Sequence, residues 1–317
     1  MRREFAKLCL ETVKSDSKSV VMVGDISHFL LRETEQVAPD RFYNIGICEQ
    51  SMVGMASGMA IEGMRPIIHT IAPFLVERAF EQIKNDIGYQ NTEVTIVTVG
   101  GTYDYSDLGC THHCYGDIAM MRLIPNMQVF EPSTPQEFRT LFEKTWGNGL
   151  PKYFRLSKEQ HSKDFEVEPE VMKVVRESKD DRWVFVSGHI LDDVLESPNI
   201  GVIYVPTLSS INKESYLKIS KVIENAKKIY SVENHFTIGG LGDFVSETKS
   251  MEKIFNTLGS NLDEFKDKTI LITGANGLIG GFLSEFFMYL NDEHDFNSKL
   301  VLFSLSDNPK LLGNLTY

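Results

Sequence analysis

The sequence lacks the features that mark membrane, nucleic-acid-binding and disulfide-stabilised proteins. No unbroken apolar stretch approaches the roughly twenty residues of a membrane-spanning helix. The net charge is −12 and no basic cluster occurs, which argues against nucleic acid or an anionic membrane surface as a partner. Four cysteines in 317 residues do not form a disulfide framework, and the N-terminal stretch MRREFAKLCLETVKSD has no signal-peptide core. We therefore expect a cytoplasmic protein.

What the sequence does contain is an alternation of strands and helices. A chain of 317 residues is long for one core, so two or three domains are expected. Its short β-branched runs have continuous apolar centres and no polar alternation, which is typical of a parallel sheet covered on both faces and predicts an α/β fold. These runs occupy residues 19–25, 65–71, 93–101, 127–133, 182–188, 201–207 and 227–233.

Two further signals divide the chain. Thr134, Pro135 and Glu137 form a T-x-x-E capping box with proline at the first helical position, which predicts a helix start. Residues 158–181 are rich in charge and poor in aromatic residues, so we interpret them as a linker between domains. The domains that we expect are 1–160, 161–250 and 251–317.

The segment 43–63, YNIGICEQSMVGMASGMAIEG, places one carboxylate at the head of an apolar run. Every residue from Ser51 to Ile61 is small or apolar, which predicts a helix that is buried nearly all round. An ionised Glu49 in such a place is costly unless another group pairs with it. Either Glu49 caps its own helix, or a partner group arrives from outside the chain.

Several separated motifs, in this order, resemble the transketolase family. Residues 44–88 and the stretch LGCTHHCYGDIAMMRLIPNMQVFEPSTPQE (108–137) resemble its pyrimidine-binding domain. The stretch IYSVENHFTIGGLGDFVSE (229–247) resembles part of its C-terminal domain. The resemblance implies an enzyme dependent on thiamine diphosphate (ThDP) that transfers a two-carbon ketol unit between sugars or sugar phosphates.

The resemblance also implies a cofactor site. In it, Glu49 hydrogen-bonds ring nitrogen N1′ of the aminopyrimidine, Phe74 stacks on that ring, and Ile47 wedges the cofactor into a bent shape. Proton sharing at N1′ favours the imino form that activates the thiazolium carbon, so the cofactor carries the reaction and the protein supplies position and electrostatics. The alternatives are a helix cap for Glu49 and core packing for Phe74.

The stretch CTHHC, residues 110–114, raises a metal hypothesis. Two Cys and two His look like zinc ligands, but a tetrahedral site usually draws its ligands from two separated pairs, so we expect no metal site. The resemblance implies instead that His112 lies near the ketose hydroxyls, where a neutral imidazole donates and accepts hydrogen bonds. Many transketolases have Glu-Asp just before the glycine, whereas this chain has Asp107 and Leu108. The substrate sugar therefore stays open.

Cations for a substrate phosphate are expected in the stretch FRLSK. The resemblance implies this role for Arg155 and Lys158, and Arg2 or Arg3 corresponds to another such position. Lys158 stands where an arginine is frequent, and a lysine lacks the bidentate guanidinium fork. Solvated surface charge is the alternative for these residues.

The sequence contains no Gly-Asp-Gly motif. In the family this motif, followed by Asn, marks the diphosphate site with its Mg²⁺. The resemblance therefore implies the C-terminal subunit of a split transketolase, with ThDP shared with an N-terminal subunit that carries the motif and binds Mg²⁺. We expect a homodimer or an α₂β₂ assembly.

Residues 268–287, KTILITGANGLIGGFLSEFF, resemble the opening of an NAD-dependent epimerase/dehydratase. Gly274, Gly277 and Gly280 follow a predicted strand and precede a predicted helix, which suits a pyrophosphate at a helix N-terminus. Only one β-α-β unit follows, and no Tyr-x-x-x-Lys pair comes after Gly274. We therefore expect a truncated dinucleotide fold that does not bind NAD well.

Three functions remain open at this point. The chain is a subunit of a ThDP-dependent ketol transferase, an NAD-dependent sugar-nucleotide enzyme with a transketolase-like scaffold, or a non-catalytic subunit. Among ThDP enzymes, deoxyxylulose-phosphate synthase and the β subunits of 2-oxoacid dehydrogenases are the nearest rivals. The set of Glu49, Phe74 and His112 favours the ketol transferase.

Overall fold

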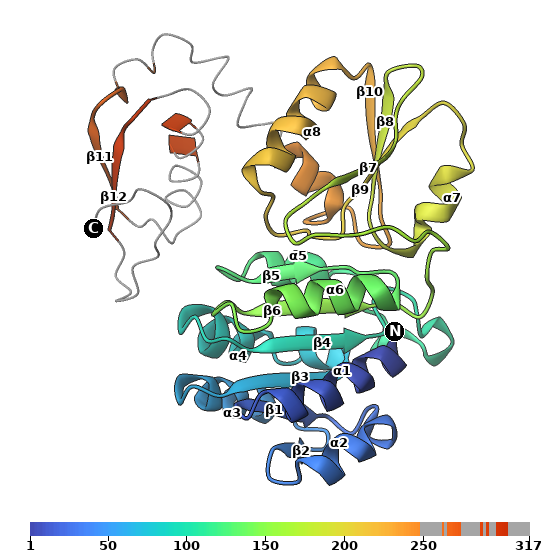
Figure 1. The fold of residues 1–317 in the computed structure, drawn as a ribbon, viewed down its shortest axis with the longest axis vertical. Coiled ribbons are helices and arrows are strands. Elements are labelled where there is room, and N and C mark those ends of the chain that lie inside the picture. The colour runs from blue at the N-terminus through green and yellow to red at the C-terminus, as the bar shows by residue number, and fades with distance from the viewer. Residues whose placement is uncertain (248–261, 263–264, 274–285, 288–289, 292–295, 304–317) are drawn as a thin grey trace. The chain divides into compact units, whose positions relative to one another are not determined.

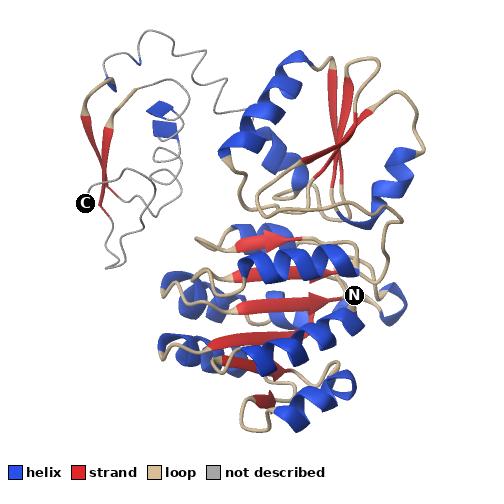
Figure 2. Cartoon of the chain, in the orientation of Figure 1, coloured by secondary structure: helices blue, strands red, loops and turns tan. Residues whose placement is uncertain are grey.

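The computed structural model describes residues 1–247, 262, 265–273, 286–287, 290–291 and 296–303. The chain forms two compact units, Met1–Val245 and Ser246–Tyr317 (Figure 1). The first unit contains two sheets with helices packed against them, as the colouring by secondary structure shows (Figure 2). No helix within the described ranges is both long enough and apolar enough to cross a membrane.

The larger sheet has six strands, and all of its strand pairs are parallel. The strand order is β2-β1-β3-β4-β6-β5, so the order reverses between β1 and β3. In open parallel sheets, ligands bind at the carboxyl ends of the strands near such a reversal. The strands are β1 (Ser19–Val23), β2 (Phe42–Asn44), β3 (Arg65–Ile71), β4 (Thr95–Val99), β5 (Gln128–Phe130) and β6 (Lys152–Leu156).

Helices cover both faces of this sheet, as its apolar strands predict. Alternate residues of β1 point to opposite faces: Val21 and Val23 join one core, and Val20 and Met22 join the other. Helices α1 (Arg2–Ser15), α2 (Arg32–Val37) and α6 (Pro135–Thr145) lie on the near face in Figure 1. On the other face lie α3 (Glu49–Ile61), α4 (Phe80–Gln82) and α5 (Asp117–Arg122), with two π-helical segments, η2 (Pro73–Glu77) and η3 (Ile83–Tyr89).

The smaller sheet has the order β10-β8-β9-β7. β8 (Arg182–Val186) pairs in parallel with β9 (Gly201–Tyr204) and β10 (Lys228–Val232), and β7 (Lys173–Arg176) is antiparallel to β9. The segment 158–181 is therefore not only a linker, because it contributes β7. Val174 pairs with Ile203 of β9, and the side chains of Val174 and Val175 pack against the two hydrophobic cores. Short helices η6 (Gly188–Ile190) and α7 (Leu191–Leu195) and the longer α8 (Lys213–Asn225) complete this part of the chain.

The helix start at Thr134 is confirmed. Its side-chain oxygen accepts a hydrogen bond from the backbone N–H of Glu137 at 3.1 Å, and Pro135 is the first residue of α6. The carboxylate of Glu137 takes a different partner set from the one that a capping box predicts. It accepts hydrogen bonds from the backbone N–H of Ser133 and the hydroxyl of Tyr204, each at 2.8 Å, and lies 2.8 Å from Nε2 of His161.

The prediction that α3 is buried nearly all round is wrong. Met52, Val53 and Ala56 lie in the core, whereas Gly54 and Gly58 are exposed and Ile61 is 62% exposed. A run of small and apolar residues predicts the helix itself but does not say which of its faces is covered.

The second unit contains β11 (Thr269–Thr273) and β12 (Lys299–Phe303), which pair in parallel. These strands stand at the two ends of the β-α-β unit that the sequence predicts. Gly274, Gly277 and Gly280 lie outside the described residues.

Candidate active site

Glu49 is the first residue of α3 and follows β2 through a tight turn. Gly46 has a φ of +71° in this turn, a conformation that glycine adopts without a steric penalty. The carboxylate is 1% exposed. Its Oε2 accepts a hydrogen bond from Nη1 of Arg78 at 2.8 Å, while Oε1 has no hydrogen-bond partner among the described residues. The helix cap position belongs to Cys48, which makes no side-chain cap bond.

Arg78 is the residue of this site that sequence reasoning missed. It follows η2, and its guanidinium carbon lies 4.6 Å from the centroid of the Phe74 ring. The amide of Gln50 donates a hydrogen bond to the backbone carbonyl of Arg78 at 3.3 Å. The spacing of four residues between Phe74 and Arg78 is the available signal, because such residues are neighbours on a helical surface.

Phe74 and His112 come together from the ends of neighbouring strands. Phe74 lies on η2 after β3, and His112 lies on a short 3₁₀-helix, η5 (Cys110–His112), after β4. Their rings meet edge to face with centroids 5.2 Å apart. Nδ1 of His112 lies 3.0 Å from the hydroxyl of Thr111. Contacts thus run from Glu49 through Arg78 and Phe74 to His112.

Ile47 and Asp107 are both exposed. Ile47 is 74% exposed in the turn before Glu49. Asp107 lies on η4 (Ser106–Leu108), in a loop whose two ends pair through Thr102 and Cys114.

The two thiols of CTHHC have different surroundings. Cys110 is exposed, and Cys114 is buried. Burial raises the pKa of the Cys114 thiol far above its ordinary value. Among the described residues, no group of three or more His, Cys, Asp and Glu side chains is arranged to hold a metal ion.

Arg155 is fully buried in a network of charged and polar groups. Its Nε lies 2.9 Å from Oδ2 of Asp117, and its Nη1 donates to Oε1 of Glu131 at 2.6 Å and to the carbonyl of Asn234 at 2.8 Å. Its Nη2 donates to the hydroxyl of Thr102. Because these acceptors already surround the guanidinium, the structure does not present Arg155 to a substrate.

Lys158 instead borders a cavity of about 540 Å³ at the carboxyl ends of β4 and β6. The start of α1 contributes Arg2, Arg3 and Lys7 to this cavity, and the loop after β4 contributes Asp104. Burial raises the pKa of the Asp104 carboxyl, against a hydrogen bond from the backbone N–H of Lys158. The lining carries four side-chain cations and two carboxylates, Asp104 and Glu4, so it is suited to an anion.

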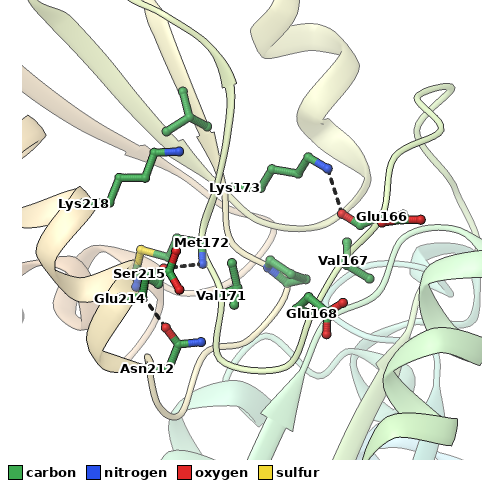
Figure 3. A pocket seen from close by; sticks show the side chains of 12 residues that line it. Glu166, Val167, Glu168, Val171, Met172, Lys173, Asn212, Glu214, Ser215 and Lys218 are labelled. Atoms are coloured by element: carbon green, nitrogen blue, oxygen red, sulfur yellow. Dashed lines mark hydrogen bonds between the residues drawn. The ribbon is translucent and has the colours of Figure 1, made fainter.

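A second cavity, of about 390 Å³, lies between α8, β7 and the segment before β7 (Figure 3). Several of its polar groups are already paired with one another. Asn212 accepts from the N–H of Ser215 at 2.9 Å, Ser215 accepts from the N–H of Met172 at 2.9 Å, and Lys173 donates to the carbonyl of Glu166 at 2.8 Å. Asn212, Ser215 and Lys173 therefore use these polar groups within the chain.

The parallel six-stranded sheet with helices on both faces and the second, smaller sheet form a transketolase-type α/β fold. Residues 1–162 match the transketolase pyrimidine-binding domain, and the chain belongs to this family.

Individual relatives agree with this assignment. The chain is 34% identical over 220 residues to a subunit of the apulose-4-phosphate transketolase of Actinobacillus succinogenes, covering 66% of this chain and 70% of that protein. It is 30% identical over 218 residues to the 1-deoxy-D-xylulose-5-phosphate synthase of Thermus thermophilus, covering 66% of this chain but only 34% of the synthase. Among solved structures, a split gene transketolase described as an inactive beta4 tetramer aligns with a TM-score of 0.69 and 30% identity, over 79% of this chain and 85% of that one.

Proposed function

We propose that this chain is the C-terminal subunit of a ThDP-dependent transketolase that transfers a two-carbon ketol unit between sugars or sugar phosphates. One observation carries the proposal. Glu49 is buried, yet its Oε1 has no hydrogen-bond partner in the described part of the chain, in a domain of the pyrimidine-binding family. An unsatisfied buried carboxylate oxygen is costly unless a ligand supplies the missing donor.

The residues of the site fit the aminopyrimidine end of ThDP. Oε1 of Glu49 is an acceptor for a protonated ring nitrogen, Phe74 offers a ring face, and Ile47 offers an exposed apolar side chain. When bound, ThDP supplies the nucleophilic carbon of the reaction. Glu49 holds the proton at N1′, and Phe74 and Ile47 orient the cofactor and exclude water. His112 exchanges hydrogen bonds with the sugar hydroxyls.

In this proposal, the cavity of about 540 Å³ beside Lys158 supplies a subsite for an anion. Lys158 and the arginines at positions 2 and 3 bind the phosphate of a sugar phosphate, and Asp107 contacts a sugar hydroxyl. Arg2 is held by hydrogen bonds from its Nε and Nη2 to the hydroxyl oxygen of Ser27, at 3.1 and 3.0 Å. Arg155 is not part of this subsite, because its guanidinium already donates hydrogen bonds to buried acceptors within the chain.

The missing half of the cofactor site belongs to a partner. Relatives named as one subunit of a transketolase and as a split gene transketolase support this division. In the proposal, an N-terminal subunit with the Gly-Asp-Gly motif binds the diphosphate and Mg²⁺ in a cytoplasmic α₂β₂ assembly. The domains are then a pyrimidine-binding domain at 1–160, a C-terminal-like domain at 161–250 and a Rossmann-like segment at 251–317.

Co-expression tests the proposed function. The chain is purified with the N-terminal subunit encoded in the same genome, and ketol transfer between sugar phosphates is measured with and without ThDP and Mg²⁺. Formation of 1-deoxy-D-xylulose 5-phosphate is measured in parallel, because the synthase is also a relative. ThDP-dependent ketol transfer supports the proposal. A stable complex that binds ThDP without ketol transfer contradicts it.

A further inference from the structure

The two oxygens of the Glu49 carboxylate have different surroundings. Oε2 lies 2.8 Å from Nη1 of Arg78, and Oε1 is buried without a partner among the described residues. A charge-assisted hydrogen bond is stronger than a neutral one, and it restricts rotation of the carboxylate about its last torsion. The ion pair therefore decides which oxygen stays open for a ligand.

Arg78 also contacts the other candidate cofactor residue. Its guanidinium carbon lies 4.6 Å from the centroid of the Phe74 ring, within the range of a cation–π contact. An arginine can make both contacts at once, because one edge of the planar guanidinium donates hydrogen bonds while its face stacks on a ring. A lysine carries the same charge but cannot reproduce this geometry.

The position of Arg78 distinguishes it from an ordinary surface ion pair. The side chain of Arg78 is 38% exposed and that of Glu49 is 1% exposed, so only the Arg78 end of the ion pair contacts water. Salt therefore screens this pair less than an ion pair between two exposed side chains. Removing Arg78 would leave the carboxylate of Glu49 buried and without a compensating charge.

We propose that Arg78 is a positioning residue, which holds Oε2 of Glu49 and the ring of Phe74 so that Oε1 faces the cofactor's aminopyrimidine. The inference rests on the proposed function, because it assigns Glu49 to that cofactor. Arg78 touches neither substrate nor reacting atoms in this role and acts through Glu49 and Phe74.

A double-mutant cycle with Glu49→Gln and Arg78→Met tests this role in the chain assembled with its N-terminal subunit. ThDP affinity is measured by calorimetry, and kcat and KM by ketol transfer. Arg78→Met is expected to lower kcat by about a hundredfold, the loss that follows a misplacement of about 1 Å, while the KM for the sugar stays within about twofold. In the Glu49→Gln background, the same change is expected to cost little more, because residues that act as a unit are not additive.

Two comparisons separate positioning from folding. Arg32 lies over the ring of Phe29 at 4.8 Å, so Arg32→Met is a matched control and is expected to retain activity. Arg78→Ala is expected to regain part of its activity and ThDP affinity when guanidinium is added, whereas Arg78→Lys restores charge only. Guanidinium does not rescue a variant that has lost its fold.

The outcomes also separate this inference from the proposed function. Full activity of Glu49→Gln overturns the proposed function and the role of Arg78 with it. If Glu49→Gln is inactive while Arg78→Met keeps normal kcat and ThDP affinity, only the role of Arg78 is overturned. Losses that add in the double variant, without rescue by guanidinium, also overturn it.

Discussion

Glu49 begins α3 with a buried carboxylate whose Oε2 is paired with Arg78 and whose Oε1 has no hydrogen-bond partner among the described residues. The first prediction concerns this residue. Glu49→Gln keeps the shape of the side chain but removes the charge that shares a proton with N1′. Ketol transfer by the assembled enzyme is expected to fall by at least about a hundredfold, the low end for lost proton-transfer catalysis.

The variant is compared with Glu62→Gln, a change at the exposed end of the same helix. Circular dichroism checks that both variants fold, and steady-state kinetics measures kcat. Near-normal turnover by folded Glu49→Gln would remove Glu49 from the mechanism.

At the scale of residues, the sequence motifs named candidate site residues but did not predict the surroundings of their side chains. Glu49, Phe74 and His112 come from separate stretches, and the structure brings Phe74 and His112 into contact and joins Glu49 to them through Arg78. Arg78 could not be found in the same way, because its ion pair joins residues 29 positions apart in the chain. Arg155 was expected at a substrate, but burial is a tertiary property that the stretch FRLSK does not reveal.

At the scale of elements, β3 contains a buried histidine that predicts a pH dependence of stability. Nδ1 of His69 lies 2.8 Å from the carbonyl of Val97, and Nε2 lies 2.9 Å from the hydroxyl of Ser27. Burial lowers the pKa of His69 from 6.5 to about 4, against the hydrogen bond to Val97, which raises it. Arg2, whose guanidinium binds Ser27, lowers this pKa further.

The direction in which stability changes with pH follows from proton uptake on unfolding. Between pH 6.5 and about 4 the unfolded chain binds the proton and the folded chain does not, so the free energy of unfolding decreases as the pH falls. The full loss is on the order of 3 kcal/mol, at about 1.4 kcal/mol for each unit of pKa difference. Urea unfolding at several pH values measures the slope. His69→Gln does not titrate and should flatten it, and an equally steep slope in this variant would assign the effect to other groups.

Four strands of the larger sheet, β1, β3, β4 and β5, could be predicted because each is a buried run rich in apolar residues. β2, β6 and β7 were not predicted: β6 contains the charged residues Lys152 and Arg155, β2 has only three residues, and β7 has four in a charged segment. Such short strands are defined by their neighbours in the sheet more than by their own composition. The exposed face of α3 was missed for a related reason, since glycine and alanine suit both a core and a surface.

At the scale of the whole molecule, the proposed division of the cofactor site between subunits predicts how ThDP binds. The chain alone is expected to bind ThDP negligibly, because it lacks the Gly-Asp-Gly motif, and to bind it firmly together with the N-terminal subunit. Titration calorimetry with each subunit and with the complex measures both states. Micromolar affinity of the isolated chain would show that it carries a complete site.

The second unit leads to a prediction about NAD. The sequence of residues 251–317 contains a Gly274-x-x-Gly277-x-x-Gly280 pattern but no Tyr-x-x-x-Lys pair after Gly274. We expect at best millimolar affinity for NAD⁺ or NADH and no reduction or oxidation of nucleotide sugars. Fluorescence titration with both forms measures the affinity. Tight binding or turnover would show that the main activity of the chain lies in residues 251–317.

The buried network around Arg155 has a consequence for dissecting this protein into autonomous fragments. The pyrimidine-binding domain matches residues 1–162, yet Arg155 donates to the carbonyl of Asn234, and Glu137 accepts from the hydroxyl of Tyr204. A fragment cut at residue 162 would keep the two buried charges and lose both of these partners. Each lost hydrogen bond to a charged group costs about 1.5–3 kcal/mol, which is a large share of the stability of an ordinary domain. The limits of sequence similarity in this chain are therefore not the limits of a piece that folds alone.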